Sequence, residues 1–77
     1  MPPSDLSSCI FEVFASVLPG EVDADTDFFD AGGDSMAAEQ VLMTLSSRLG
    51  LDLPGWLLLD HPTVTSLSAA LSDIMRG

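Results

Sequence analysis

The sequence changes from an acidic loop to a helical pattern at Phe28-Phe29-Asp30-Ala31-Gly32-Gly33-Asp34-Ser35. Adjacent glycines permit backbone conformations that other residues avoid, and they therefore suit a sharp turn into a helix. Asp34 is a favourable N-cap residue, which makes Ser35 the first residue of the helix. Free N–H groups and the helix dipole favour a negatively charged substituent at that position. The stretch predicts an exposed serine at the start of a rigid helix.

Three segments of the chain place apolar residues at the spacing of an amphipathic helix. The first starts near Ser4 or Asp5, either of which is a suitable cap, and ends at Pro19-Gly20. The second runs from Ser35 to Gly50, because glycine commonly follows the last turn of a helix. The apolar stripes of these two segments are Leu6, Ile10, Val13, Phe14 and Val17, and Ala38, Val41, Leu42, Leu45 and Leu49.

The third segment runs from about Val64 to Met75. Thr63 is its expected cap, because Pro62 prevents a helix from continuing through from upstream. Before it, Trp56-Leu57-Leu58-Leu59 predicts one short helical turn, since no second strand candidate exists with which it would pair. The stripe expected to face the core is Val64, Leu67, Leu71, Ile74 and Met75.

These segments predict an all-α fold, a small bundle of three main helices and one short one with a long first loop. A chain of 77 residues has room for one domain, and we expect that domain to cover residues 1–77. The long first loop extends from Pro19 to Asp34, and loops of such length in compact domains are usually functional.

Composition excludes several classes of protein. Twelve acidic residues face two arginines and no lysine, for a net charge of −10, which disfavours nucleic acid and favours basic partner surfaces. Cys9 is the only cysteine, so an internal disulfide is excluded and a four-ligand zinc site is not expected. No apolar run approaches the roughly 18 residues of a membrane span. We expect a soluble, cytoplasmic monomer without a metal.

The aspartates of the long loop partly match a calcium-binding EF-hand loop. Asp23, Asp25 and Asp27 fall at its first, third and fifth positions, and Asp34 falls at the twelfth. However, Phe28 stands where the loop needs glycine, and Asp34 replaces the longer bidentate glutamate. A solvated acidic loop explains the same residues.

A serine hydrolase is another interpretation of the same region. Gly33-Asp34-Ser35-Met36-Ala37 nearly spells the nucleophile elbow, but its last glycine is replaced and no strand precedes it. A nucleophilic serine also needs a base, and the only histidine is His61, directly before a proline. Simple capping of an ordinary helix is a third interpretation of Asp34 and Ser35.

A family resemblance extends over nearly all 77 residues. This resemblance rests on four stretches of the sequence: Asp27-Phe28-Phe29-Asp30, Gly32-Gly33-Asp34-Ser35, Leu53-Pro54 and Asp60-His61-Pro62-Thr63-Val64. The chain resembles the thiolation domains of nonribosomal peptide synthetases, also called peptidyl carrier proteins, within the acyl carrier protein superfamily. The resemblance implies a helical bundle of the acyl carrier type with 4'-phosphopantetheine, derived from coenzyme A, attached covalently to Ser35. Gly33 and Asp34 belong to the same cofactor-binding motif.

The resemblance implies a carrier without catalytic activity of its own. A phosphopantetheinyl transferase would modify Ser35, an adenylation or acyl-loading enzyme would attach an aminoacyl or acyl group as a thioester, and a condensing or tailoring enzyme would receive it. An acyl carrier protein of a polyketide-type pathway is the alternative. The chain departs from the family pattern at two places. Ala31 stands where leucine is usual, and Pro54-Gly55-Trp56-Leu57 is less charged than the usual segment before the short helix. These departures bear on how the loop packs and on which partner enzyme binds the chain.

A docking face for these partner enzymes is predicted on the helix that starts at Ser35. At 100° per residue, Met36, Gln40, Met43 and Ser47 share the face opposite the apolar stripe. Methionine adapts to several partner surfaces, and two methionines on a solvated face favour a docking role.

Overall fold

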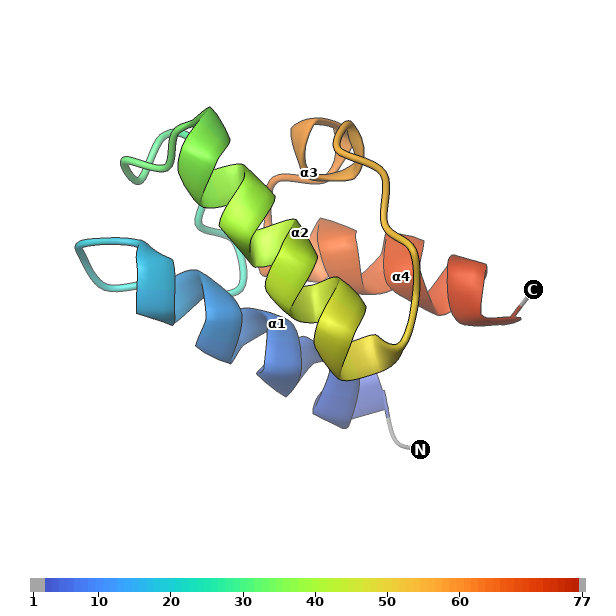
Figure 1. Ribbon diagram of the computed structural model, residues 1–77. Coiled ribbons are helices and arrows are strands. Elements are labelled where there is room, and N and C mark those ends of the chain that lie inside the picture. The colour runs from blue at the N-terminus through green and yellow to red at the C-terminus, as the bar shows by residue number, and fades with distance from the viewer. Residues whose placement is uncertain (1–2, 77) are drawn as a thin grey trace.

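The computed structural model describes the backbone of residues 3–76 and the side chains of residues 6–76. It contains the helices α1 (Pro3–Val17), α2 (Ser35–Leu49), α3 (Leu57–Asp60) and α4 (Val64–Arg76), and no strand is present in residues 3–76. α1 packs against both α2 and α4, and the short α3 lies at one end of the bundle (Figure 1). The predicted all-α bundle with a long first loop is confirmed. No helix within residues 3–76 is long and apolar enough to cross a membrane.

The ends of α2 lie where the capping residues predict. The N–H of Ala37 donates to Asp34 Oδ1 at 2.9 Å, which satisfies one of the free donors at the helix start. At the other end, Gly50 adopts a left-handed conformation with φ of 67°, and its N–H donates to the carbonyl of Ser46. Both predicted caps of α2 are therefore confirmed.

The first helix begins earlier than predicted. α1 starts at Pro3, so the expected caps Ser4 and Asp5 fall within its first turn, and their side chains lie outside the described residues. Proline is well tolerated at the first position of a helix, because its φ suits the helix and its missing N–H would have had no intrahelical acceptor. The predicted start of α1 was therefore two or three residues too late.

The start of α4 is fixed by a reciprocal cap. Thr63 Oγ1 accepts the N–H of Ser66 at 3.0 Å, and Ser66 Oγ accepts the N–H of Thr63 at 3.2 Å. Immediately upstream, the apolar run forms the single turn α3, with Leu57 and Leu58 buried. The predicted cap Thr63 and the predicted short helical turn are both confirmed.

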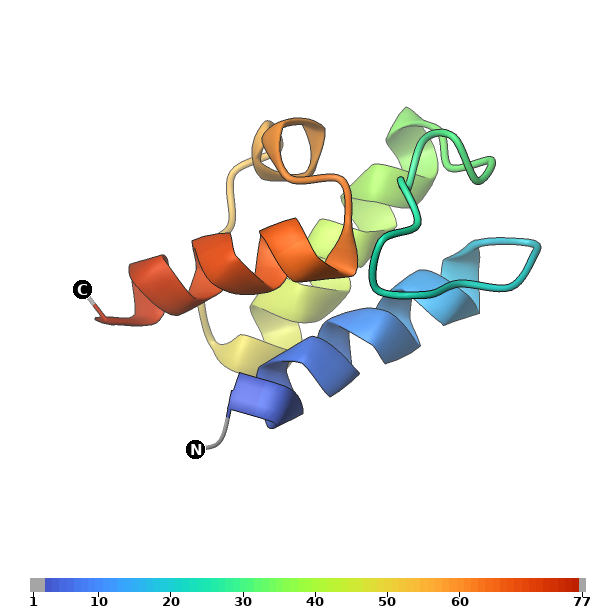
Figure 2. The ribbon, with the colours of Figure 1, turned by 180° about the vertical axis from the view of Figure 1, so that it is seen from behind.

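The core lies where α1, α2 and α4 meet, and it contains most of the predicted stripes. Ile74 and Met75 are exceptions, since 43% and 51% of their surfaces are exposed. The last turn of α4 projects beyond the other helices (Figures 1 and 2), and these two side chains are therefore only partly covered. The buried residues are Ile10, Val13, Phe14, Leu18, Phe28, Ala38, Val41, Leu42, Leu45, Leu53, Leu57, Leu58, Val64, Leu67 and Leu71.

The long loop is attached to the start of α4. The N–H of Phe28 donates to the carbonyl of Pro62 at 2.8 Å, and the N–H of Thr65 donates to the carbonyl of Ala24 at 3.1 Å. The Phe28 ring is fully buried and meets the Phe14 ring edge-on, with 5.1 Å between centroids. These contacts fix the segment that leads into Ser35 against α1 and α4 (Figure 2).

Candidate attachment site

Ser35 is the first residue of α2 and is exposed to solvent. The preceding Asp34 caps the helix twice, because its side chain accepts the N–H of Ala37 and its carbonyl accepts the N–H of Ala38, both at 2.9 Å. The N–H groups of Ser35 and Met36 come still earlier in the helix, where no intrahelical acceptor exists. The serine hydroxyl therefore lies at the positive end of the helix dipole, on a rigid element.

A sequence of tight turns leads into this serine. Asp27 Oδ1 accepts the N–H groups of Phe29 and Asp30 at 2.9 and 3.2 Å, so its carboxylate organises the first turn. Gly32 follows with φ of 106°, a backbone conformation that residues with a Cβ rarely adopt. Ala31, which stands where the family usually has leucine, is half-buried and packs against the core. The loop thus reaches Ser35 in one defined path.

Gly33 is required for a different reason from Gly32. Its φ is not positive, but its N–H donates to the carbonyl of Phe28 at 3.0 Å, which brings the two backbones close together. A Cβ at Gly33 would lie 2.7 Å from that carbonyl oxygen and even closer to the Phe28 ring. The close approach leaves no space for a side chain.

Gly33→Ala is expected to lower the free energy of unfolding by about 1–3 kcal/mol, because the new methyl group would force Phe28 out of its place in the core. Gly20→Ala is the matched control, since no atom lies within 4 Å of a Cβ there and its φ is not positive. Urea denaturation of both variants checks this. Equal stability of the two variants would show that the Phe28–Gly33 contact does not constrain the loop.

A hollow opens beside Ser35 between α2 and α3. Its volume is about 350 Å³, and Leu59 of α3 forms one wall with 67% of its surface exposed. The sequence did not reveal this hollow, because its walls come from segments far apart in the chain. The one available signal was the apolar run at α3, since a single helical turn cannot bury four consecutive large side chains. The lining residues are Phe29, Ser35, Ala38, Glu39, Leu42, Gly55 and Leu59.

The exposed face of α2 is as the helical phase predicts. Met36 and Met43 have 74% and 68% of their surfaces exposed, and Gln40 and Ser47 are also exposed. The same helix buries Val41 and Leu45 completely on its other side. The predicted exposure of these four residues is confirmed, whereas their role in docking remains a prediction.

The loop aspartates stabilise turns in this structure. Asp23 Oδ1 accepts the N–H of Asp25 at 2.9 Å and the hydroxyl of Thr26 at 3.0 Å, as in a short capped turn. Within residues 6–76, no three His, Cys, Asp or Glu side chains converge on a point where a metal ion would be held. The EF-hand interpretation of Asp23, Asp25, Asp27 and Asp34 therefore gains no support.

The structure gives no support to the serine hydrolase interpretation either. His61 lies at the C-terminal end of α3, where its N–H donates to the carbonyl of Leu57. In the described part of the chain, no hydrogen bond joins the Ser35 hydroxyl to His61. Within residues 6–76, the pairing of Ser35 with His61 that a serine hydrolase would need is therefore not present.

Comparison with known proteins identifies the family of the chain. A model of the family described as "Phosphopantetheine attachment site" matches residues 10–71, which include both motifs of the loop and the start of α4. The chain belongs to this family. The family match also confirms the cofactor predicted for this carrier domain, 4'-phosphopantetheine.

Relatives of this carrier domain occur in peptide synthases. It is 36% identical to tyrocidine synthase 3 of Brevibacillus parabrevis over 92% of its own length, but it spans about 1% of that relative. A free-standing peptidyl carrier protein from Acinetobacter baumannii has 29% identity and a TM-score of 0.86, with 95% of each chain covered. The resemblance to peptidyl carrier proteins is confirmed.

The fold of the carrier domain is also that of an acyl carrier protein. BlmI, a type-II acyl carrier protein from Streptomyces verticillus, superposes with a TM-score of 0.89 at 22% identity, with 95% of this chain and 89% of BlmI covered. At that identity the similarity concerns the fold alone. The predicted bundle of the acyl carrier type is confirmed.

Proposed function

We propose that residues 1–77 form a single carrier domain in which Ser35 bears the phosphopantetheine arm and holds an aminoacyl or acyl group for nonribosomal peptide or related secondary-metabolite biosynthesis. The observation that supports this most directly is the position of Ser35. It is an exposed serine on the first residue of α2, within the region that matches the phosphopantetheine attachment family.

The residues around Ser35 fit such a group. Its hydroxyl is open to solvent, and the first N–H groups of α2 favour the negative phosphodiester that would be joined to Oγ. When bound, the arm supplies a terminal thiol that carries the acyl or aminoacyl group as a thioester. Asp34 fixes the start of the helix through Ala37, and Gly33 fixes the loop against Phe28. These two residues position Ser35 for attachment.

The chain performs no catalysis in this proposal and depends on three partner enzymes. A phosphopantetheinyl transferase modifies Ser35, an adenylation or acyl-loading enzyme loads the arm, and a condensing or tailoring enzyme receives the cargo. A net charge of −10 attracts basic surfaces on these enzymes and opposes nucleic acid. Attachment to one carrier raises the effective concentration of the cargo at each enzyme. The carrier acts in the cytoplasm as a monomer, without a membrane.

The proposal is tested by incubating the chain with coenzyme A, magnesium and a promiscuous phosphopantetheinyl transferase. We expect intact-mass spectrometry to show one added phosphopantetheine group per chain. Loading of the modified chain by amino-acid adenylation enzymes, compared with loading by polyketide acyltransferases, then separates the peptide role from the polyketide role. A chain whose mass does not change under these conditions would contradict the carrier function.

Met43→Glu is expected to slow loading by the cognate adenylation enzyme at least tenfold, equivalent to about 1.4 kcal/mol. The added charge would interrupt the proposed docking stripe of Met36, Gln40, Met43 and Ser47. Because Met43 is 68% exposed, the free energy of unfolding should change by no more than roughly 0.5 kcal/mol.

Loading rates of the modified variants check this prediction, with Ala69→Glu on the exposed surface of α4 as the charge-matched control. The control variant should load at the rate of the unaltered chain. Normal loading of folded Met43→Glu would place the docking surface elsewhere.

A further inference from the structure

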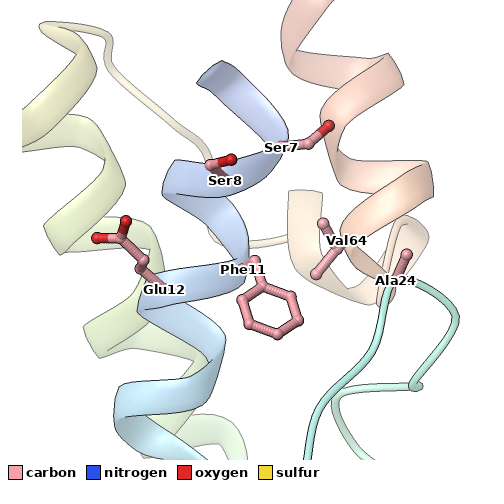
Figure 3. A pocket seen from close by; sticks show the side chains of 6 residues that line it. All are labelled: Ser7, Ser8, Phe11, Glu12, Ala24 and Val64. Atoms are coloured by element: carbon pink, nitrogen blue, oxygen red, sulfur yellow. The ribbon is translucent and has the colours of Figure 1, made fainter. Parts of the chain in front are cut away.

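Two surface hollows meet at Phe11 on α1. One has a volume of about 330 Å³ and extends from Phe11 to Ala24 of the long loop and Val64 of α4 (Figure 3). The other, of about 390 Å³, extends from Phe11 over Ala15 to Val22. Phe11 has 40% of its surface exposed between them, although it is a large aromatic residue. We name this feature the Phe11 groove; its lining includes Phe11, Ala15, Glu21, Asp23, Ala24 and Val64.

The walls of the Phe11 groove are fixed by hydrogen bonds. The hydroxyls of Ser7 and Ser68 lie 3.0 Å apart and link α1 to α4. The carbonyl of Ala24 accepts both the N–H and the hydroxyl of Thr65, each at 3.1 Å, which links the loop to α4. The groove is therefore formed before any partner arrives, so that binding has little ordering cost.

One end of the Phe11 groove has an acidic rim, because Glu21 and Asp23 line that hollow. Glu12 lines the other hollow, but its carboxylate points toward α2, where it pairs with Arg48 (Figure 3). The chain has only two cationic side chains: Arg48 lies 3.6 Å from Glu12, and Arg76 lies in the last turn of α4. Neither arginine lines the groove. An apolar floor with an acidic rim complements an apolar side chain flanked by basic residues.

The Phe11 groove is separate from the exposed face of α2. It opens between α1 and the start of α4, with α2 on the other side of α1 (Figure 3). We propose that the groove is a second docking surface, which binds a basic segment of a partner protein through an apolar anchor side chain. A partner held there leaves Ser35 and the methionines of α2 accessible to a second enzyme. This proposal does not depend on modification of Ser35.

The test is a titration of the ¹⁵N-labelled, unmodified chain with a hexapeptide that has a Leu-Phe pair between two pairs of lysines. We expect amide shifts to change most around Phe11, Ala15 and Ala24. Phe11→Ala should weaken the affinity at least tenfold. Ile74→Ala is the matched control, because the exposure of Ile74, 43%, is close to that of Phe11, and it should leave the affinity unchanged.

Two further measurements complete the test. A hexapeptide with Ser-Ser in place of Leu-Phe measures attraction by charge alone, and it should bind at least tenfold more weakly. Ala15→Lys, at an exposed helical position, adds a repelling charge without removing any packing, and it should also weaken binding. The proposal is overturned if the largest shifts occur around Met36 and Met43, or if Phe11→Ala and Ala15→Lys both bind like the unaltered chain.

Discussion

Replacement of Phe28 with alanine is expected to lower the free energy of unfolding by about 3–5 kcal/mol, the usual cost of deleting a fully buried aromatic ring. Phe28 has no exposed surface, meets Phe14 and Phe29 edge-on, and covers Gly33. Natural domains are stable by only about 0.05–0.15 kcal/mol per residue, so this loss would remove a large part of the stability of a 77-residue chain. The loop into Ser35 would lose its anchor at the same time.

Phe11→Ala provides the control for this prediction, because it removes the same atoms from a side chain that is 40% exposed. Its cost is expected to be about 1 kcal/mol, and urea denaturation of both variants gives the comparison. Similar losses for the two variants would mean that Phe28 does not anchor the loop as the structure indicates.

The parts of this fold that depend on local sequence could be predicted. Asp34 and Gly50 delimit α2 because each satisfies backbone groups within its own helix end. The exposed serine at the start of α2 and the exposed methionines on its outer face follow from the same cap and the helical period. The position and exposure of these residues on α2 therefore follow from the local sequence alone.

The parts that depend on contacts between distant segments could not be predicted. No periodic pattern shows that the N–H of Phe28 bonds to Pro62, or that Ala24 bonds to Thr65. The helical period also placed Ile74 and Met75 in the core, because periodicity does not reveal where neighbouring helices end. The hollow beside Ser35 and the Phe11 groove were missed for the same reason, since each is formed by several segments.

Ser35→Ala is expected to abolish modification by phosphopantetheine while the fold remains intact. The side chain is exposed, and the cap of α2 depends on Asp34 and the Ala37 N–H, neither of which is changed. The free energy of unfolding should therefore change by no more than roughly 0.5 kcal/mol. Ser47→Ala is the matched control, because it removes the same hydroxyl from an exposed position of the same helix.

Intact-mass spectrometry of the Ser35→Ala and Ser47→Ala variants, after incubation with coenzyme A, magnesium and a phosphopantetheinyl transferase, tests the central claim most directly. We predict that Ser47→Ala gains one phosphopantetheine group and that folded Ser35→Ala gains none. A phosphopantetheine adduct on the Ser35→Ala variant would contradict the assignment of Ser35 as the attachment point.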